Sequence, residues 1–480
     1  MSDKKPFYIT TTLPYVNAEP HMGHALEFVR ADIVARSKKL QGYDVFLNTG
    51  TDEHGQKIFT AAEKNGKEVQ EYADHYASKF KELLSRLGVS EDVHFVRTTD
   101  PNHVAAAQEF WKRVNENGYI YKKNYKTKYC VGCESEKTDS EIVDGKCEIH
   151  TNLELEVREE ENYFFKYSAF KEKLTEFYER NPNFVLPESR LNEMKEFVSH
   201  LEDFSISRLK EKMSWGVPVP GDETHVMYVW FDALVSYIST LGWPNNEEAF
   251  EKFWKNGEPT QYCGKDNTRF QAAMWQAMLM AAGLPNSKRI VVNGFVTAEG
   301  GVKMSKSLGN VVNPVDIINE YGTDALRYFV ARELSTFEDT PFTIERFKDA
   351  YNSGLANGIG NLTSRIMKMA QDNLEGPVEV NVINVGNLTE DDINNFEIQK
   401  AISQIFAAIG LLDVTIQTKE PFKLVKADPE AGKAIIKTLV EQLFAIGVNL
   451  EPFMPETSRK IIEAVKENKL SEPLFPRLNA

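Results

Sequence analysis

The strand–helix–strand order of the first fifty residues constrains the fold more than any other feature of this chain. FYITTTL at 7–13 is rich in strand-forming residues, and ALEFVRADIVARSKKLQG at 25–42 carries apolar residues at helical spacing. DVFLNTG at 44–50 predicts a second, buried strand. Two strands joined through a helix pair in parallel, and such sheets bind ligands beyond the carboxyl ends of their strands. The segment lacks G-x-G-x-x-G and therefore the dinucleotide-binding fingerprint.

The α/β pattern stops near residue 118 and returns near residue 221. The stretch between them contains a Cys/His cluster, the acidic run LELEVREEEN and short aromatic runs, so we interpret it as an insertion. Beyond GVKMSKSLGNVV, apolar residues recur every three or four positions, which predicts a helical bundle. The predicted fold class is α/β: a parallel-sheet domain split by an insertion and followed by an α-helical bundle.

Composition limits the class of protein. At 480 residues the chain is too long for one core, and its 42% hydrophobic and 26% charged residues are ordinary for a soluble globular protein. We find no apolar run of membrane-spanning length, and the N-terminus MSDKKPFYITTTLPY resembles no targeting peptide, so we expect a cytoplasmic protein. A net charge of −15 argues against a general nucleic-acid coat but permits an RNA partner on a local basic face.

Three of the four cysteines lie close together and indicate a metal site. The pattern is Cys130-x2-Cys133, thirteen intervening residues, then Cys147-x2-His150. Four soft ligands at this spacing predict one structural Zn²⁺, because a closed four-ligand site leaves no position for a catalytic water. The alternative is a pair of incidental turns with buried thiols. Cys263 stands apart, and we expect it to be a small buried hydrophobe.

Two short motifs indicate phosphate chemistry. In PHMGHALEF, His21 and His24 lie on one face of a helix start, where backbone N–H groups lack intrahelical partners, and Gly23 permits close approach of an anion. In KMSKS, Lys303 and Lys306 form a compact cation pair that can neutralise charge on a reacting phosphate. The alternatives are histidines that only cap and pack, and a solvated basic turn.

The HMGH and KMSKS motifs together resemble the signature pair of class I aminoacyl-tRNA synthetases. Within that class, TTTLPYVNAEPHMGHA, TGTDEHGQK, YVWFDALVSY and GIGNLTSR resemble the methionyl-tRNA synthetases, from residue 7 to about residue 460. The resemblance implies a methionine–tRNA ligase. Such an enzyme activates L-methionine with ATP to methionyl-adenylate and pyrophosphate, then transfers the methionyl group to the 3′-terminal ribose of tRNA(Met).

The resemblance also implies the residues that handle ATP, which is bound with Mg²⁺. His21 and His24 bind the phosphates, while Lys303 and Lys306 stabilise the α-phosphate and the departing pyrophosphate. The remaining ATP-binding positions are Gly23, Gly264 and Asp266. A carboxylate near the ATP ribose can accept hydrogen bonds from its hydroxyls, although Asp266 is also a common type of turn residue.

Methionine recognition is assigned by the same resemblance. Asp52 accepts hydrogen bonds from the substrate ammonium, and an aromatic cavity suits the thioether. The assigned residues are Leu13, Tyr15, Asp52, Trp230, Ala233, Tyr237, Phe270 and Gln271. The alternative is that the aromatic members are simply core residues. The chain departs from the family at Gln271, where histidine is usual, and at Met274, where an aromatic is usual, so we expect a pocket of somewhat altered shape.

Asn361 and Arg365 of GNLTSR are four residues apart on a predicted helix and can read base edges of an unstacked loop. The resemblance implies that they read a CAU anticodon with a third, aromatic residue. Phe422 stands where the family has tryptophan, with Lys419, Lys423 and Lys426 around it. The alternatives are a local cap for Asn361, an acidic partner for Arg365 and packing between helices for Phe422.

The resemblance divides the chain into functional segments. They are a first Rossmann-like catalytic half at 1–117, a connective insertion with the zinc knuckle at 118–220, a second catalytic half at 221–302, the KMSKS loop and stem-contact region at 303–350, and an α-helical anticodon-binding domain at 351–480. No dimer-forming C-terminal domain follows, so we expect a monomer. Two other hypotheses remain open: a catalytically silent paralogue that senses tRNA or adenylate, and an enzyme for another apolar amino acid.

Overall fold

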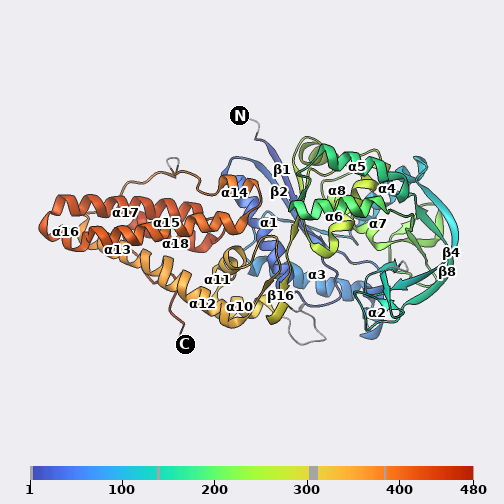
Figure 1. Cartoon of the computed structure of the whole chain (residues 1–480), viewed down its shortest axis with the longest axis horizontal. Helices are drawn as coiled ribbons and strands as arrows, with labels where there is room; N and C mark the ends of the chain where they lie inside the picture. The colour runs from blue at the N-terminus through green and yellow to red at the C-terminus, as the bar shows by residue number, and fades with distance from the viewer. Residues whose placement is uncertain (1–3, 138–140, 302–311, 383–384, 479–480) are drawn as a thin grey trace. The chain divides into compact units, whose positions relative to one another are not determined.

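The computed structural model describes residues 4–137, 141–301, 312–382 and 385–478 (Figure 1). These residues form two compact units. Unit 1 takes in residues 1–20, 43–83 and 91–293, and unit 2 takes in residues 21–42, 84–90 and 294–480.

Unit 1 is built on a six-stranded parallel sheet in the order β3-β2-β1-β14-β15-β9. The strands are β1 (Pro6–Thr10), β2 (Asp44–Thr51), β3 (His94–Arg97), β9 (Val185–Leu186), β14 (Pro259–Gly264) and β15 (Arg289–Asn293). In the register, Tyr8 of β1 lies opposite Phe46 on one side and Pro259 on the other. The predicted parallel sheet is confirmed. Strand order reverses between β1 and β14, which is where open α/β sheets form their ligand crevice.

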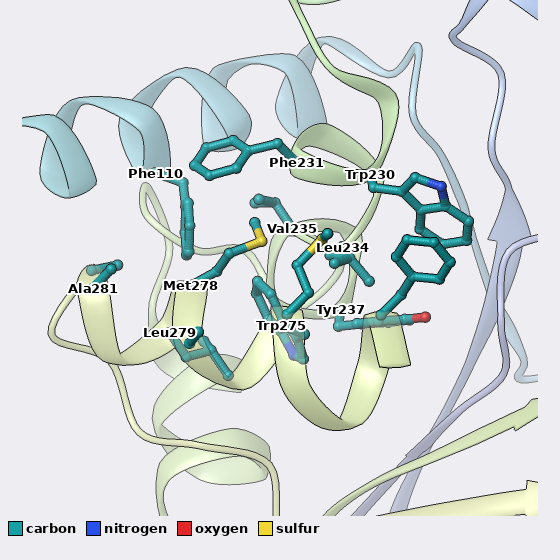
Figure 2. Packing of buried hydrophobic residues seen from close by; sticks show 14 of the residues in the cluster. Phe110, Trp230, Phe231, Leu234, Val235, Tyr237, Trp275, Met278, Leu279 and Ala281 are labelled. Carbon is teal, nitrogen blue, oxygen red and sulfur yellow. The ribbon is translucent and has the colours of Figure 1, made fainter. Parts of the chain in front are cut away.

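Helices of unit 1 supply its apolar core. Phe110 of α4 stacks on Trp275 of α9 with ring centroids 5.7 Å apart, and Phe231 of α7 packs at 6.0 Å from Phe110 (Figure 2). The elements are α2 (Gln56–Lys64), α4 (Pro101–Glu116), α5 (Lys171–Arg180), α6 (Glu188–Ser199), α7 (Val229–Ala233), α8 (Ser236–Ser239) and α9 (Trp275–Ala281), with η2 (Tyr167–Phe170), η3 (Phe250–Lys255), η4 (Lys265–Asn267) and η5 (Phe270–Met274). Helix α3 (Val69–Arg86) ends in unit 2.

The predicted insertion contains a long antiparallel ribbon, drawn as a curved pair of strands in Figure 1. It pairs β4 (Ile120–Cys130) with β8 (Glu156–Phe165), and β5 (Ser135–Lys137) and β10 (Phe204–Ser205) complete the sheet. Lys122 pairs with Glu161 at 3.6 Å across this ribbon, so the acidic run faces cross-strand lysines. The smaller strands are β6 (Ile142–Val143), β7 (Lys146–Cys147), β11 (Ser207–Leu209), β12 (Pro218–Val219) and β13 (Asp222–Met227). Strand β9 returns from this segment to the main sheet beside β15.

Unit 2 contains the predicted helical bundle, which is confirmed. Its long helices pack on one another through α17, which contacts α13, α15, α16 and α18 (Figure 1). The bundle consists of α13 (Asn361–Asn373), α15 (Ile398–Lys419), α16 (Pro421–Ala427), α17 (Pro429–Leu450) and α18 (Pro455–Glu467). The rest of the unit contains α1 (Met22–Leu40), α10 (Pro314–Tyr321), α11 (Thr323–Tyr328), α12 (Ile344–Ala350), α14 (Glu390–Asn394), β16 (Val296–Thr297), β17 (Thr340–Pro341), η6 (Glu299–Gly301), η8 (Phe329–Glu333) and η9 (Tyr351–Gly360).

Residues 398–427 contradict the prediction that no segment has membrane-spanning length and apolarity. Among the described residues, this helical stretch is long and apolar enough to cross a membrane by length and composition, with a mean hydropathy of 1.4 in its apolar window. The stretch comprises α15 and α16, which pack against α17 in the bundle. Packing on α13 and α17 accounts for part of this apolarity, since 39% of the window is buried within the protein, while Leu411 and Val414 are exposed.

Helix α1 is fixed within unit 2 by buried polar groups. The Arg30 guanidinium donates to the backbone carbonyls of Leu334, Ser335 and Thr336 at 2.7–3.0 Å. Asp32 pairs with Arg327 at 2.8 Å, and both side chains are fully buried. A buried charge is tolerated only when it is paired in this way, so these contacts set the position of α1 and of the histidines at its start.

Candidate functional site

The predicted pocket residues meet beyond the carboxyl ends of β1 and β2. Tyr15 and Asp52 form an isolated parallel bridge. The Asp52 N–H donates to the carbonyl of Pro14 at 3.0 Å, and the Val16 N–H donates to the carbonyl of Asp52 at 3.2 Å. The loop after β1, which carries Leu13 and Tyr15, is thereby tied to the end of β2.

Aromatic rings continue this group of predicted pocket residues. Tyr15 meets Trp230 edge to face at 6.1 Å, and Trp230 stacks on Phe270 at 4.0 Å with the ring planes 3° apart. Figure 2 shows Trp230 at the edge of the core cluster, with its indole nitrogen turned away from the other side chains. Ala233 and Tyr237 follow on the same chain segment and are buried. The aromatic members therefore belong to the buried core, and Trp230 lies at its edge.

Three buried polar atoms around these rings have no hydrogen-bond partner among the described residues. They are Asp52 Oδ1, the Tyr15 hydroxyl and Trp230 Nε1. Each unpaired buried group costs on the order of 1–3 kcal/mol, so such a cluster is typical of a site that completes its hydrogen bonds with a ligand. Burial, the charge of Asp232 and the charge of Glu134 raise the pKa of Asp52 well above its usual range.

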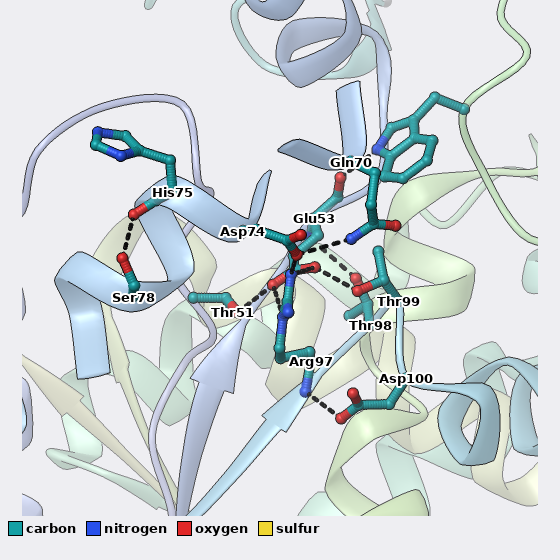
Figure 3. Close-up of polar contacts among 11 residues, drawn as sticks. Thr51, Glu53, Gln70, Asp74, His75, Ser78, Arg97, Thr98, Thr99 and Asp100 are labelled. Atoms are coloured by element: carbon teal, nitrogen blue, oxygen red, sulfur yellow. Dashed lines mark hydrogen bonds and ion pairs between the residues drawn. The ribbon is translucent and has the colours of Figure 1, made fainter. Parts of the chain in front are cut away.

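The loop that carries Asp52 is held by Glu53, which the sequence analysis did not single out. Arg97 donates to both Glu53 carboxylate oxygens at 2.7 and 2.9 Å (Figure 3). The hydroxyls of Thr51 and Thr99 also donate to this carboxylate, at 2.6 and 2.5 Å. Because these hydrogen bonds hold the Glu53 side chain in place, they also fix the backbone beside Asp52. The only sequence signal was the place of Glu53 within TGTDEHG.

A second network joins the same loop to α7, the helix that carries Trp230. The two carboxylate oxygens of Asp232 lie 2.6 Å from His54 Nδ1 and 2.6 Å from His103 Nε2. His103 also lies 2.9 Å from the Ser239 hydroxyl. Burial alone would raise the pKa of Asp232, but the two histidines hold it below its ordinary value. These residues come from four separate segments, and no sequence spacing related them.

The Gln271 side chain is bonded within the protein. Its amide nitrogen donates to the Thr12 hydroxyl at 2.9 Å, and its amide oxygen accepts from Gln261 at 3.3 Å. The side chain is fully buried, as is most of Met274. Both ends of the amide thus have protein partners, which the sequence analysis did not foresee when it assigned Gln271 to the ligand.

Gly264 and Asp266 lie at the same edge of the sheet as the pocket, because β14 is the parallel neighbour of β1. Gly264 is the last residue of β14, and Asp266 lies in the short helix η4 that follows, with its side chain exposed. Cys263 is buried in the strand itself, as predicted.

In unit 2, His21 and His24 cap the helix α1 reciprocally. The Gly23 N–H donates to His21 Nδ1 and the His21 N–H donates to His24 Nδ1, both at 3.1 Å, and the two rings stack at 3.8 Å. A Cβ on Gly23 would lie 2.9 Å from the His21 ring, so a larger residue here would displace that ring. Because each Nδ1 accepts, a neutral ring carries its proton on Nε2 and presents a donor suited to a phosphate oxygen.

The helix start differs from the prediction in one respect. The N–H groups expected to bind an anion already have partners, since Met22 N–H donates to the Val312 carbonyl at 3.3 Å and Gly23 N–H donates to His21. Capping and phosphate binding are thus compatible, but the imidazoles carry the donors. Lys303 and Lys306 lie outside the described residues.

The Cys/His cluster brings its four predicted ligands together in unit 1. The ligand atoms of Cys130, Cys133, Cys147 and His150 all lie within 4.8 Å of one another. A Cβ on Gly132 would lie 2.6 Å from the His150 ring, so the turn between the first two cysteines is shaped to admit that ring. Although burial raises it, the pKa of Cys147 lies below its ordinary value because backbone N–H groups point at the sulfur. Three sulfurs and an imidazole at this spacing fit a tetrahedral metal ion.

The predicted RNA-reading residues lie on exposed parts of the helical bundle. Arg365 of α13 pairs with Asp413 of α15, and both side chains are about one-third exposed. Asn361 is exposed at the start of α13 and, with Asp413, lines a cavity of about 320 Å³. Phe422 of α16 is 44% exposed, so it does not pack between helices. Lys423 lies over its ring at 5.9 Å.

Comparison with known proteins agrees with this arrangement. Residues 7–155 and 133–367 match the family model described as tRNA synthetases class I (M). The methionine–tRNA ligase of Caldanaerobacter subterraneus subsp. tengcongensis is 40% identical over 477 residues, which are 96% of this chain and 74% of that protein. The methionine–tRNA ligase of Rhizobium meliloti is 39% identical over 489 residues, covering 97% of this chain and 92% of that protein.

Solved structures give the same result. Mycobacterium tuberculosis methionyl-tRNA synthetase in complex with methionyl-adenylate superposes with a TM-score of 0.90 at 35% identity, covering 98% of this chain and 100% of that one. Its apo form superposes with a TM-score of 0.83 at 32% identity. The fold and the site thus define a class I aminoacyl-tRNA ligase. Within that class, the chain belongs to the methionyl-tRNA synthetase family, whose reaction is the activation of methionine and the charging of tRNA.

Proposed function

We propose that Asp52 and its aromatic surroundings bind L-methionine for activation by ATP. The main support for this proposal is that Asp52 is buried with one unpaired carboxylate oxygen, and that the hydroxyl of its bridge partner Tyr15 is also unpaired. A substrate ammonium supplies the missing donors and the opposite charge, which makes a charge-assisted hydrogen bond. The stacked rings of Trp230 and Phe270 suit a thioether, since sulfur–ring contacts contribute roughly 0.3–1.5 kcal/mol.

The proposal also assigns residues to ATP, which is bound with Mg²⁺. The Nε2 donors of His21 and His24 bind the phosphates, and Asp266, near Gly264, accepts hydrogen bonds from the ribose. Lys303 and Lys306 stabilise the α-phosphate and the departing pyrophosphate. The reaction needs positioning and charge stabilisation rather than a covalent intermediate with the protein.

The Cys/His cluster holds one structural Zn²⁺ in this proposal. The metal would be bound by the four ligands described above and would tie together a segment with little apolar content of its own. We expect close to one Zn²⁺ per purified chain, and we expect Cys147→Ser to make the insertion protease-sensitive while the bundle stays folded. Less than about a tenth of an equivalent of metal would contradict a structural site.

The tRNA partner is tRNA(Met), with its CAU anticodon read by the bundle. Asn361 and Arg365 supply an amide and a guanidinium to base edges, and the exposed ring of Phe422 stacks on a splayed base. The proposal includes a monomer located in the cytoplasm. The mass of the purified protein in solution and cell fractionation test these two points.

Methionine-dependent ATP–pyrophosphate exchange is the central test. We expect exchange with methionine and much weaker exchange with leucine, valine and norleucine. Lys306→Ala and His24→Ala should each lower kcat by about 10²–10³-fold, because they remove transition-state contacts. Near-normal exchange in Lys306→Ala would overturn the role of that loop. An absence of exchange in the wild type would favour a catalytically silent paralogue. A preference for leucine would favour an enzyme for another apolar amino acid.

A further inference from the structure

Glu134 follows Cys133, yet its side chain points away from the metal cluster into unit 1. It is 2% exposed and has a left-handed backbone, with φ 52°. Left-handed conformations are uncommon for glutamate, so the surrounding contacts hold it there. One carboxylate oxygen accepts a hydrogen bond from the Tyr129 hydroxyl at 2.6 Å.

The other oxygen of Glu134 holds the first turn of α2. It accepts a hydrogen bond from the backbone N–H of Lys57 at 2.5 Å. The N-cap of α2 is Gly55, which has no side chain to cap the helix. A carboxylate at a helix start satisfies a backbone donor and interacts favourably with the helix dipole, so Glu134 does what an N-cap side chain does in other helices.

Gly55 is shaped for this contact. Its φ is 106°, and a Cβ there would lie 3.4 Å from a Glu134 carboxylate oxygen and 3.5 Å from Val229 of α7. The start of α2 therefore fits closely between the knuckle segment and the helix that carries Trp230. A substitution at Gly55 would strain the backbone whatever the space.

The loop that leads into α2 is the loop that carries Asp52. It runs through residues 52–55 and is fixed at its β2 end by the Glu53–Arg97 pair and in the middle by the His54–Asp232 pair. At its far end it is fixed by Glu134 through Lys57. Glu134 is thus a direct contact between the Cys/His segment and the helix that follows the loop of Asp52.

A second line of contacts from Tyr129 supports the same connection. The Arg208 guanidinium lies 5.0 Å from the ring centroid of Tyr129 and 5.0 Å from that of Tyr228. Tyr228 is the N-cap residue of α7, two residues before Trp230. The partners of Glu134 therefore border both the loop of Asp52 and the aromatic wall.

We propose that Glu134 is a positioning residue for methionine, which couples the Cys/His knuckle to the loop of Asp52 by fixing the start of α2. This inference rests on the proposed function, because it takes Asp52 to be the group that binds the substrate ammonium. Glu134 itself does not touch the substrate. Its loss should weaken methionine binding and leave the affinity for ATP unchanged.

The test compares three substitutions by calorimetric titration with methionine. Glu134→Asp keeps the charge and tolerates the left-handed backbone but is too short to reach the Lys57 N–H. We expect it to weaken methionine affinity about tenfold, as for the loss of a helix cap. Glu134→Gln keeps an acceptor for Lys57 and should restore most of the affinity. Glu148→Ala is the matched control, because Glu148 also adjoins a cysteine of the cluster but is exposed.

Metal content and the KM for ATP are measured for each variant. An intact zinc content, an unchanged KM for ATP and a tenfold weaker methionine affinity in Glu134→Asp support the inference. Wild-type methionine affinity in Glu134→Asp overturns it. Loss of zinc together with methionine affinity also overturns it, since the weaker binding would then follow from loss of the metal and not from loss of the contact with Lys57.

A separate variant distinguishes this inference from the proposed function. If Asp52→Asn binds methionine like the wild type, the assignment of Asp52 is wrong, and the inference that depends on it is wrong too. If Asp52→Asn binds weakly while Glu134→Asp binds normally, the pocket assignment stands and only the role of Glu134 is overturned.

Discussion

The proposed methionine site of unit 1 and the proposed RNA-reading face of unit 2 are built in opposite ways. Asp52 is 2% exposed, and the residues on either side of it are held by an ion pair with Arg97 and a hydrogen bond with Asp232. On the bundle, Phe422 is 44% exposed and Leu411 is 68% exposed. One site consists of buried side chains with unpaired polar atoms, and the other exposes apolar side chains to solvent near a cavity of about 320 Å³.

The difference is the one expected if the first site binds an amino acid and the second binds RNA, as proposed. A small amino acid offers few contacts, so the protein has to place each polar group in advance. In a buried, low-dielectric site each hydrogen bond is stronger than in water. An RNA loop offers a large surface, and stacking and phosphate contacts add up without a deep cavity. We therefore expect single substitutions to have larger effects in the pocket than on the bundle.

The largest effect is expected for Asp52→Asn. The substitution keeps the shape but removes the charge that pairs with the substrate ammonium, a contact that contributes up to about 3 kcal/mol. We expect kcat/KM for methionine in pyrophosphate exchange to fall about a hundredfold, with little change in KM for ATP. Asp413→Asn is the matched control on the bundle and should leave exchange unchanged. Equal effects of the two substitutions would break the comparison between the regions.

A smaller effect, on a different step, is expected for Arg365→Ala. Loss of a guanidinium that reads a base edge should lower aminoacylation of tRNA with a CAU anticodon about thirtyfold, with methionine–ATP exchange intact. Lys368→Ala is the control, because Lys368 lies on the same helix, is exposed and pairs with Asp372. Equal charging of a transcript whose anticodon is changed away from CAU would show that the bundle does not read these bases.

Much of the framework could be predicted from the sequence, because its signals are local. The first two strands, the helix between them and the bundle follow from patterns within one segment, although β1 ends at Thr10, short of the predicted residue 13, and α1 begins at Met22, before the predicted residue 25. The four cluster residues could be found because metal ligands have a characteristic spacing, and the cluster indeed comes together.

The supporting contacts could not be predicted, because they join distant segments. His103 reaches Asp232 across 129 positions and Lys57 reaches Glu134 across 77, with no periodicity to relate them. The partners of Gln271 were missed for the same reason, since Thr12 is 259 positions away. The Asp413 partner of Arg365 was foreseen only as an unspecified acid.

Acid should weaken methionine binding, by at most about tenfold in affinity for each pH unit. Burial and the charges of Asp232 and Glu134 raise the pKa of Asp52, so its proton is retained to higher pH in the free enzyme than for an exposed carboxyl. The substrate ammonium requires the charged carboxylate, so binding releases this proton. Methionine affinity should therefore fall as pH falls below the raised pKa. Calorimetry in buffers of different ionisation enthalpy measures the proton release, and Asp52→Asn should abolish both effects.

The smallest expected effect concerns Phe422. Its ring is exposed and stands at the start of α16 beside Lys423, so it is free to stack on a base with a cation close by. A phenyl ring overlaps a base less than an indole does, so we place its contribution at the low end of the range for base stacking. Phe422→Ala should raise KM for tRNA about fivefold and leave exchange untouched.

Phe422→Trp sharpens the same prediction, because a larger ring that stacks should lower KM for tRNA below the wild-type value. Leu411→Ala removes another exposed apolar side chain from the bundle and controls for a general loss of apolar surface. If Phe422→Ala and Phe422→Trp both charge tRNA like the wild type, Phe422 does not stack on the anticodon. Anticodon reading would then depend on the base-edge contacts of Asn361 and Arg365 alone. The exposed face would in that case use hydrogen bonds without an aromatic ring, unlike the proposed methionine site.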